Sequence, residues 1–188
     1  MYAPNMLKGF RGVPIVAMVA WSLASCNSAA RNAAVSVPNA EQEISPAMKK
    51  LYMAAAATAP QSQAQQKVVL QMAERASNGK ELLLVMRAAV GTFPAGSRSQ
   101  EHPAEGHLRS MVTAKMIQFG TLDQLMEYST QYSVNPESAR RFVQRMFQLG
   151  DQDSDPRVWY RIRLAAARLK VDDLQRQAQA KGDQLAGR

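Results

Sequence analysis

The chain is poor in cysteine and in aromatic residues, and each shortage argues against a kind of structure. One cysteine among 188 residues leaves no disulfide within the chain. Aromatic residues make up 6%, while methionine and alanine are plentiful. Adaptable methionine and small alanine favour helix-on-helix packing over a sheet sandwich. The composition therefore predicts a helical protein without covalent cross-links.

Strand patterns, long apolar runs and common catalytic motifs are also missing from the sequence. No run of four to eight residues alternates apolar with polar side chains and is rich in β-branched residues. The most apolar run, 13–24, is shorter than the roughly 20 residues that span a bilayer. There is no glycine-rich phosphate loop, serine-elbow motif or pair of acid–base carboxylates in a supporting context. We therefore expect an all-α protein that is not an enzyme and needs no cofactor.

The N-terminal stretch from Lys8 to Asn27 has the three-part layout of a secretory signal. Two cations precede an apolar core, and small residues follow before Cys26. Pro14 lies near the start of the core, where a first helical turn tolerates it. The segment Leu23-Ala24-Ser25-Cys26 resembles a bacterial lipobox, the site at which a lipoprotein precursor is lipidated and cut.

The resemblance to lipoproteins implies a definite set of modifications. The Cys26 sulfur would carry a diacylglyceryl group, the chain would be cut before it, and the new N-terminus would be acylated, as palmitate labelling detects. Two or three acyl chains attach a protein stably to a membrane. Asn27 follows the cysteine, and by the enterobacterial sorting pattern it predicts the periplasmic face of the outer membrane rather than the inner membrane.

Other interpretations of the N-terminus remain open at the sequence level. Ordinary cleavage after Ala24 uses Ser22 and Ala24 as the small residues of the site. An uncleaved cytosolic N-terminus leaves the apolar run 15–21 without a purpose. Met6 is an alternative start that changes none of these arguments.

The chain is basic, with a net charge of +8 that falls by two to +6 when Lys8 and Arg11 leave with the signal. In a cytosolic protein this excess would indicate nucleic acid. Outside the inner membrane the available polyanions are phospholipid headgroups, lipopolysaccharide and acidic proteins. We expect envelope proteins and the membrane as partners, and no nucleic acid.

Three segments follow from these patterns. Residues 1–25 are the predicted signal, 26–44 the lipidated cysteine with a flexible tether rich in Ala, Ser, Asn and Val, and 45–188 a helical domain. Caps, prolines and apolar spacing predict six to seven helices in that domain, and its tail, 175–188, is expected to fray. Helix starts are expected at or near Ser45, Pro60, Asn78, Pro103, Thr121, Asn135 and Asp155.

Some of these helices carry sharper predictions. Asn78 with Glu81, and Thr121 with Gln124, have the spacing of capping boxes. The run 82–86 is apolar nearly all round, so we expect this helix at the centre of the core, ending at Gly91. The stretch from there to Pro103 is the longest interruption of the pattern.

The prolines at 60, 103 and 136 suggest a weak repeat of helical hairpins. Their intervals of 43 and 33 residues resemble the period of tetratricopeptide arrays, but the Trp-Leu-Gly-Tyr signature of that family is absent. The domain is therefore expected to be either an irregular bundle or a short solenoid of hairpins.

Two places invite a search for chemistry. His102 and His107 are five residues apart with a proline between them, so they do not share a helix face and no metal site is expected. Glu137-Ser138 resembles the glutamate-serine step of lytic transglycosylases, which are envelope enzymes, but their downstream motifs are absent. An acidic residue in a first helical turn is also favoured by the helix dipole alone.

A basic strip is predicted near the C-terminus. Arg157, Arg161 and Arg168 are spaced four and seven apart and fall near one helix face. The strip is either a docking site for an acidic partner or lipid headgroups, or a solvated face paired with the acidic turn 151–155.

Three functions are compatible with the sequence. The first is a non-catalytic interaction or assembly protein of an envelope machine of secretion, pilus or conjugation type. The second is a peptidoglycan-binding or peptidoglycan-processing lipoprotein that uses Glu137 or the histidines. The third is a cytosolic nucleic-acid binder, which requires the signal to be false. We expect the first.

Overall fold

The computed structural model describes residues 43–94 and 102–187. These residues contain helices and no strand, which confirms the all-α class. The residues of the predicted signal and lipobox, with Cys26 and Asn27, lie outside these ranges, as does most of the predicted tether. None of the described helices has the length and apolar content that crossing a bilayer requires.

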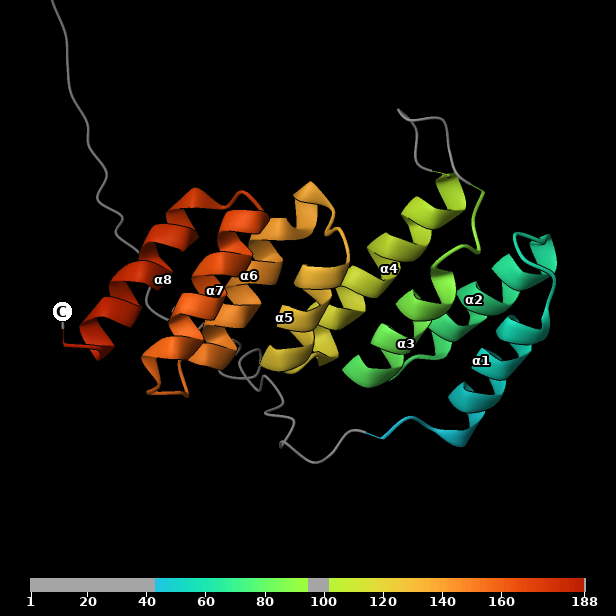
Figure 1. Cartoon of the computed structure of the whole chain (residues 1–188), viewed down its shortest axis with the longest axis horizontal. Helices are drawn as coiled ribbons and strands as arrows, with labels where there is room; N and C mark the ends of the chain where they lie inside the picture. The colour runs from blue at the N-terminus through green and yellow to red at the C-terminus, as the bar shows by residue number, and fades with distance from the viewer. Residues whose placement is uncertain (1–42, 95–101, 188) are drawn as a thin grey trace, which may run out of the picture. The chain divides into compact units, whose positions relative to one another are not determined.

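Eight helices make up the described part of the chain, one more than the upper prediction. They are α1 (Pro46–Ala57), α2 (Gln63–Arg75), α3 (Gly79–Ala89), α4 (Pro103–Phe119), α5 (Leu122–Gln131), α6 (Pro136–Gly150), α7 (Pro156–Arg168) and α8 (Asp172–Leu185). They follow one another in a row from α1 to α8 (Figure 1).

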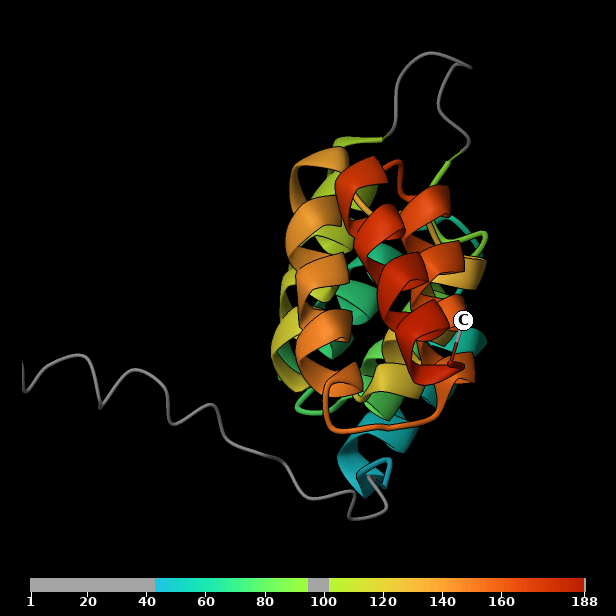
Figure 2. The same ribbon diagram turned by 90° about the vertical axis from the view of Figure 1, so that its left-hand side faces the viewer.

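The helices form two layers, because each one contacts only the next helix and the next but one. The contacts α1–α3, α3–α5 and α5–α7 build a layer of odd-numbered helices, and α2–α4, α4–α6 and α6–α8 build a layer of even-numbered ones. Viewed along the row, the helices stack behind one another (Figure 2). This is the contact pattern of a hairpin solenoid, the second of the two predicted architectures.

Most helices begin where the sequence predicts. The Ser45 hydroxyl caps α1, and proline occupies the first turn of α1, α4, α6 and α7. The capping box of Thr121 and Gln124 is present in full. Pro60, by contrast, lies in the loop: α2 starts three residues later because Ser62 supplies its cap.

The predicted capping box at α3 is only half formed. Asn78 accepts the backbone N–H of Glu81 at 3.0 Å, but the Glu81 carboxylate does not turn back to Asn78. It accepts the backbone and hydroxyl of Ser45 at 3.0 and 2.6 Å, and those of Ser77 at 2.9 and 3.0 Å. Glu81 therefore ties the start of α1 to the turn between α2 and α3.

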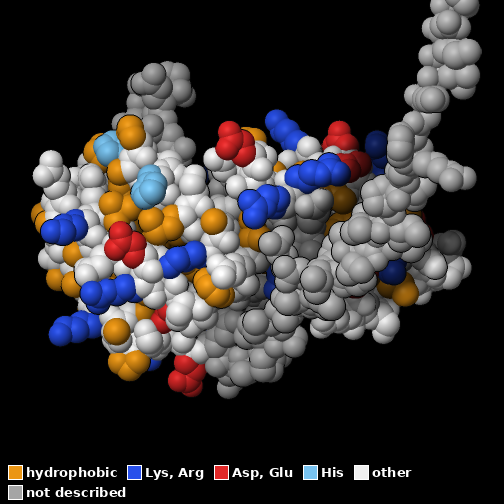
Figure 3. All heavy atoms as spheres, turned by 180° about the vertical axis from the view of Figure 1, so that it is seen from behind, with side chains coloured by type: hydrophobic (Ala, Val, Ile, Leu, Met, Phe, Trp, Pro, Cys, Tyr) orange, Lys and Arg blue, Asp and Glu red, His pale blue; other side chains and the backbone are white. Residues whose placement is uncertain are grey.

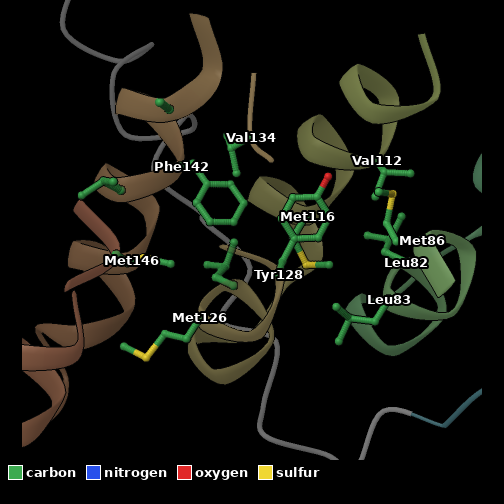
Figure 4. Packing of buried hydrophobic residues seen from close by; sticks show 14 of the residues in the cluster. Leu82, Leu83, Met86, Val112, Met116, Met126, Tyr128, Val134, Phe142 and Met146 are labelled. Atoms are coloured by element: carbon green, nitrogen blue, oxygen red, sulfur yellow. The ribbon is translucent and has the colours of Figure 1, made fainter. Parts of the chain in front are cut away.

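The core is continuous along the row, and α3, which was predicted at its centre, lies in its first half. Leu82, Val85 and Met86 of α3 are buried, and this helix contacts α1, α2, α4 and α5. The packing continues through α4 and α5 to Phe142 and Met146 of α6 (Figure 4). Gly91 has a φ of +76°, a left-handed conformation that glycine adopts without strain, and it follows the end of α3 as expected.

The tail 175–188 was expected to fray, but residues 175–185 belong to α8, which runs to Leu185. Leu174 and Ala178 are buried on one side of α8, and Gly182 packs against the Tyr160 ring of α7. Lys170 has a φ of +57°, which turns the chain back so that α8 packs against α7 and α6. The sequence did not predict this helix because two of its three buried residues, Ala178 and Gly182, are small and give little apolar periodicity.

Candidate docking groove

The three arginines of the predicted strip lie exposed on α7, and two of them reach α5. Arg161 Nη2 donates to Asp123 Oδ1 at 3.0 Å, and Arg168 Nη1 donates to the backbone oxygen of Ser129 at 3.2 Å. Because α5 and α7 are neighbours in the odd-numbered layer, these bonds bridge two adjacent helices of the layer.

The acidic turn 151–155, which was the alternative partner of the strip, contacts other groups. Asp155 caps α7 by accepting the Arg157 N–H at 2.9 Å, and Asp153 accepts the N–H of Asp155 at 2.8 Å. Asp151 faces Lys181 of α8 at 3.9 Å. Among the described residues, no ion pair joins this turn to the α7 arginines; Arg161 pairs with Asp123 of α5 instead.

Between α5 and α7 lies a hollow of about 560 Å³ with an apolar base and a charged edge. Met126 and Ala165 form the apolar part, and Leu164 stands beside them with 59% of its surface exposed. Asp123 and Arg161 line the edge as an ion pair. An exposed leucine next to a hollow is suited to an apolar side chain of a partner.

A second hollow of about 840 Å³ adjoins the first, and both are lined by Arg168 and residues 129–131. It extends over the α5–α6 loop to the α7–α8 turn at 169–171. Arg140 and Asp173 line it with a two-pronged ion pair at 3.0 and 2.6 Å, which joins α6 to α8. We call the two hollows together the C-terminal groove.

The groove carries equal numbers of basic and acidic side chains. Those that line it are Arg140, Arg161, Arg168, Lys170, Asp123, Glu127, Asp172 and Asp173. The face shown in Figure 3 also mixes Lys and Arg with Asp and Glu instead of separating them. A mixed surface is suited to an occupant with charges of both signs rather than to a polyanion.

Tyr132 lines the groove and keeps its phenolic proton. Burial raises the pKa of Tyr132 above its usual value, against the opposing influence of Arg87. Arg87 itself pairs with Glu127 of α5 at 3.1 Å. At neutral pH the Tyr132 hydroxyl is therefore available as a hydrogen-bond donor beside the groove.

The other residues singled out in the sequence lie elsewhere. His102 caps α4 by accepting the Ala104 N–H at 3.3 Å, and His107 is exposed on that helix. Glu137 is exposed in the first turn of α6, where its N–H donates to Asn135. Within residues 43–94 and 102–187, no three His, Cys, Asp or Glu side chains gather as metal ligands would.

Sequence reasoning missed Asp123 and Leu164. Leu164 had a usable signal: it interrupts the exposed arginine face of α7, away from the buried stripe of Val158, Ile162 and Ala165. No pattern in the sequence pointed to Asp123, because its ion pair with Arg161 depends on α5 lying next to α7 in the fold.

Comparison with known proteins adds no relative. Scans against protein-family models, curated proteins and solved structures each found no match for this chain.

Proposed function

We propose that this chain is a lipid-anchored envelope protein whose helical domain binds other proteins and catalyses no reaction. In this proposal Cys26 carries the lipid, the domain stands at the periplasmic face of the outer membrane, and the C-terminal groove receives a partner of a multiprotein envelope machine. The lipobox-like segment supports the anchor. The groove supports the binding role.

The observation that carries the proposal is the groove between neighbouring helices of one solenoid layer. Layers of this kind present side chains from several helices along one surface, which suits extended or helical segments of a partner. Here Leu164 and Met126 offer apolar contact, and the paired charges around them offer polar contact. We infer an amphipathic partner segment with charges of both signs.

The experiment uses a photo-cross-linking amino acid at position 164 in cells that make the full chain, with position 185 as the matched control. Leu164 and Leu185 are both exposed leucines, but only Leu164 lines the groove. The expected result is one discrete cross-linked protein at 164 that is absent at 185. Equal products at both positions, or none at either, would refute the proposed binding role.

A companion measurement tests the anchor. The mass of the mature protein should correspond to cleavage before Cys26 with acyl chains added, and a palmitate analogue should label the wild type but not Cys26→Ser. An unlabelled wild-type chain that retains residues 1–25 would refute the anchor and revive the cytosolic alternative.

A further inference from the structure

The two ends of the solenoid have outer faces of different character. A terminal helix has a neighbour on one side only, so its outer face meets whatever surrounds the domain. The exposed residues of α8 are mostly polar: Asp172, Arg176, Gln177, Ala180, Lys181, Gln184 and Leu185. The exposed residues of α1 are Pro46, Ala47, Lys49, Lys50, Met53, Ala54, Ala56 and Ala57. The outer face of α1 is therefore apolar except for two lysines.

Met53 stands out on this face because 66% of its surface is exposed, although a large apolar side chain is usually covered. The alanines beside it are too small to shield it. An apolar helix face flanked by lysines is characteristic of helices that lie in a membrane interface.

More positive charge gathers where α1 begins. Glu81 ties Ser45, at the start of α1, to Ser77 in the turn between α2 and α3. That tie brings the end of α2 with Arg75, and the first turn of α3 with Lys80, to the same end of the domain.

The cations at this end have no ion pair within the described ranges. Lys49, Lys50, Arg75 and Lys80 are all exposed and form none there. Their exposed acidic neighbours in sequence are Glu43 and Glu74. The cations outnumber these acids and remain available to an external anion.

The chain also enters the domain at this end. Asn78 Nδ2 donates to the backbone oxygen of Glu43 at 3.1 Å, which fixes the point of entry beside α3. Cys26 precedes Ser45 by 19 residues, a stretch that reaches at most about 65 Å when fully extended. A lipid on Cys26 therefore confines this end to the neighbourhood of a bilayer.

We propose that the outer face of α1 lies on the anionic membrane surface that holds Cys26. Lys49 and Lys50 contact headgroup phosphates, Met53 enters the interfacial layer, and Arg75 and Lys80 add to the attraction. This inference rests on the proposed lipid anchor. It extends the proposed function by giving the domain a fixed orientation, with the C-terminal groove at the opposite end of the row.

The contact needs little intrinsic affinity, because the tether makes it intramolecular. Each lysine near an anionic surface strengthens binding about fivefold, and one methionine adds a small apolar contribution. Free in solution such a face binds weakly, whereas a covalent tether supplies an effective concentration in the millimolar range.

The experiment places an indole on the face and reads its contact with lipid. Mature chain carrying Met53→Trp and lipid on Cys26 is inserted into phosphatidylcholine vesicles with or without phosphatidylglycerol, and brominated acyl chains serve as the quencher. Trp159 is 1% exposed and provides an unquenched background. Gln177→Trp on the exposed face of α8 is the matched control position.

We expect quenching of the indole at 53 in anionic vesicles, and none at 177. Replacing both Lys49 and Lys50 with glutamine should lower the docked-to-undocked ratio by about 30-fold, since two charges near the surface are lost. Arg141→Gln with Arg176→Gln removes the same charge elsewhere and should leave quenching unchanged. Equal quenching in neutral and anionic vesicles, or none in either, would overturn the proposal.

Two further arms identify other occupants and separate this inference from the anchor. If the cell does not lipidate Cys26, the proposed anchor is refuted. The α1 face can still be tested, because a maleimide lipid is then coupled to the Cys26 thiol. Protection of the indole from iodide without lipid would also overturn the inference. If that protection depends on protein concentration, a second copy of the chain covers position 53. If it does not, residues 27–42 of the same chain cover it.

Discussion

Glu81 is a carboxylate with only 1% of its surface exposed, and its place in the structure depends on its hydrogen bonds. A buried charge is costly unless it is satisfied, and here the backbone N–H and hydroxyl groups of Ser45 and Ser77 donate to it. These bonds connect residues 36 positions apart in the chain. Glu81 is thus a structural anchor for α1 rather than a candidate catalytic acid.

Replacing Glu81 with glutamine should destabilise the domain although the side chain keeps its size. The amide offers one oxygen in place of two and adds N–H groups that face donors, so we expect a loss of about 2–3 kcal/mol, as for hydrogen bonds to a charged group. Urea unfolding followed by circular dichroism measures it. Glu74→Gln, at an exposed position on α2, should change the free energy of unfolding little, and equal effects would contradict this assignment.

The same carboxylate should make stability fall in acid. Burial raises the pKa of Glu81, but the bonds from Ser45 and Ser77 lower it more, and the folded pKa lies below the 4.5 of a free glutamate. The stabilisation is therefore complete above pH 4.5 and is lost as the pH falls through the lower folded pKa. Asp173, whose pKa the bond from Arg140 lowers, acts in the same direction. In Glu81→Gln the acid-dependent loss of unfolding free energy should be smaller than in wild type, and an unchanged pH profile would contradict the assignment.

Lys115 of α4 closes the end of α2. Its ammonium donates to the backbone oxygens of Ala73, Glu74 and Ala76 at 2.9, 2.5 and 3.1 Å, where that helix leaves carbonyls without intrahelical partners. Lys115→Met should cost about 1–2 kcal/mol of unfolding free energy, measured by urea denaturation. Lys67→Met, an exposed lysine near the start of α2, is the control. A loss as large in the control would show that the capping role is unimportant.

At the scale of the helices, the sequence predicted what is decided locally. The caps at Ser45, Thr121 and Asp155 lie within a few residues of the groups they satisfy, and all were found. The bond between Glu81 and Ser45 was missed because the two residues are 36 positions apart in the chain. Asp123 was missed for the same reason: only the fold places α5 beside α7 and so creates the groove.

Helix α8 shows why small residues conceal a buried face. A Cβ added to Gly182 would lie 2.9 Å from the Tyr160 ring, so glycine permits the close approach of α8 to α7. Gly182→Leu should destabilise the domain by about 1–3 kcal/mol through overpacking. The loosened α8 should also shift Trp159 fluorescence to longer wavelength, because Lys181 of α8 lies 5.6 Å from that ring. Ala180→Leu, exposed on the same helix, should leave the spectrum and stability unchanged, and a similar shift there would contradict the packing argument.

At the scale of the whole domain, contacts limited to neighbouring helices predict graded stability. Interior helices such as α3 and α5 have partners on both sides along the row, whereas α1 and α8 lie at its ends. Hydrogen exchange followed by mass spectrometry on the mature chain without membranes should therefore show the slowest exchange in α3–α6 and faster exchange in α1 and α8. Uniform protection across all described helices would indicate a single cooperative bundle instead.

Because each helix contacts only the next helix and the next but one, the length of the solenoid can change while the packing between its helices stays the same. A hairpin duplicated in the middle of the row would meet the same kind of neighbours on both sides and would lengthen the domain without redesigning either end. If α1 faces the bilayer and α7 binds the partner protein, the number of hairpins between these helices sets the distance between the lipid and that partner. Changes in domain length among descendants of this sequence would then record changes in the dimensions of the assembly.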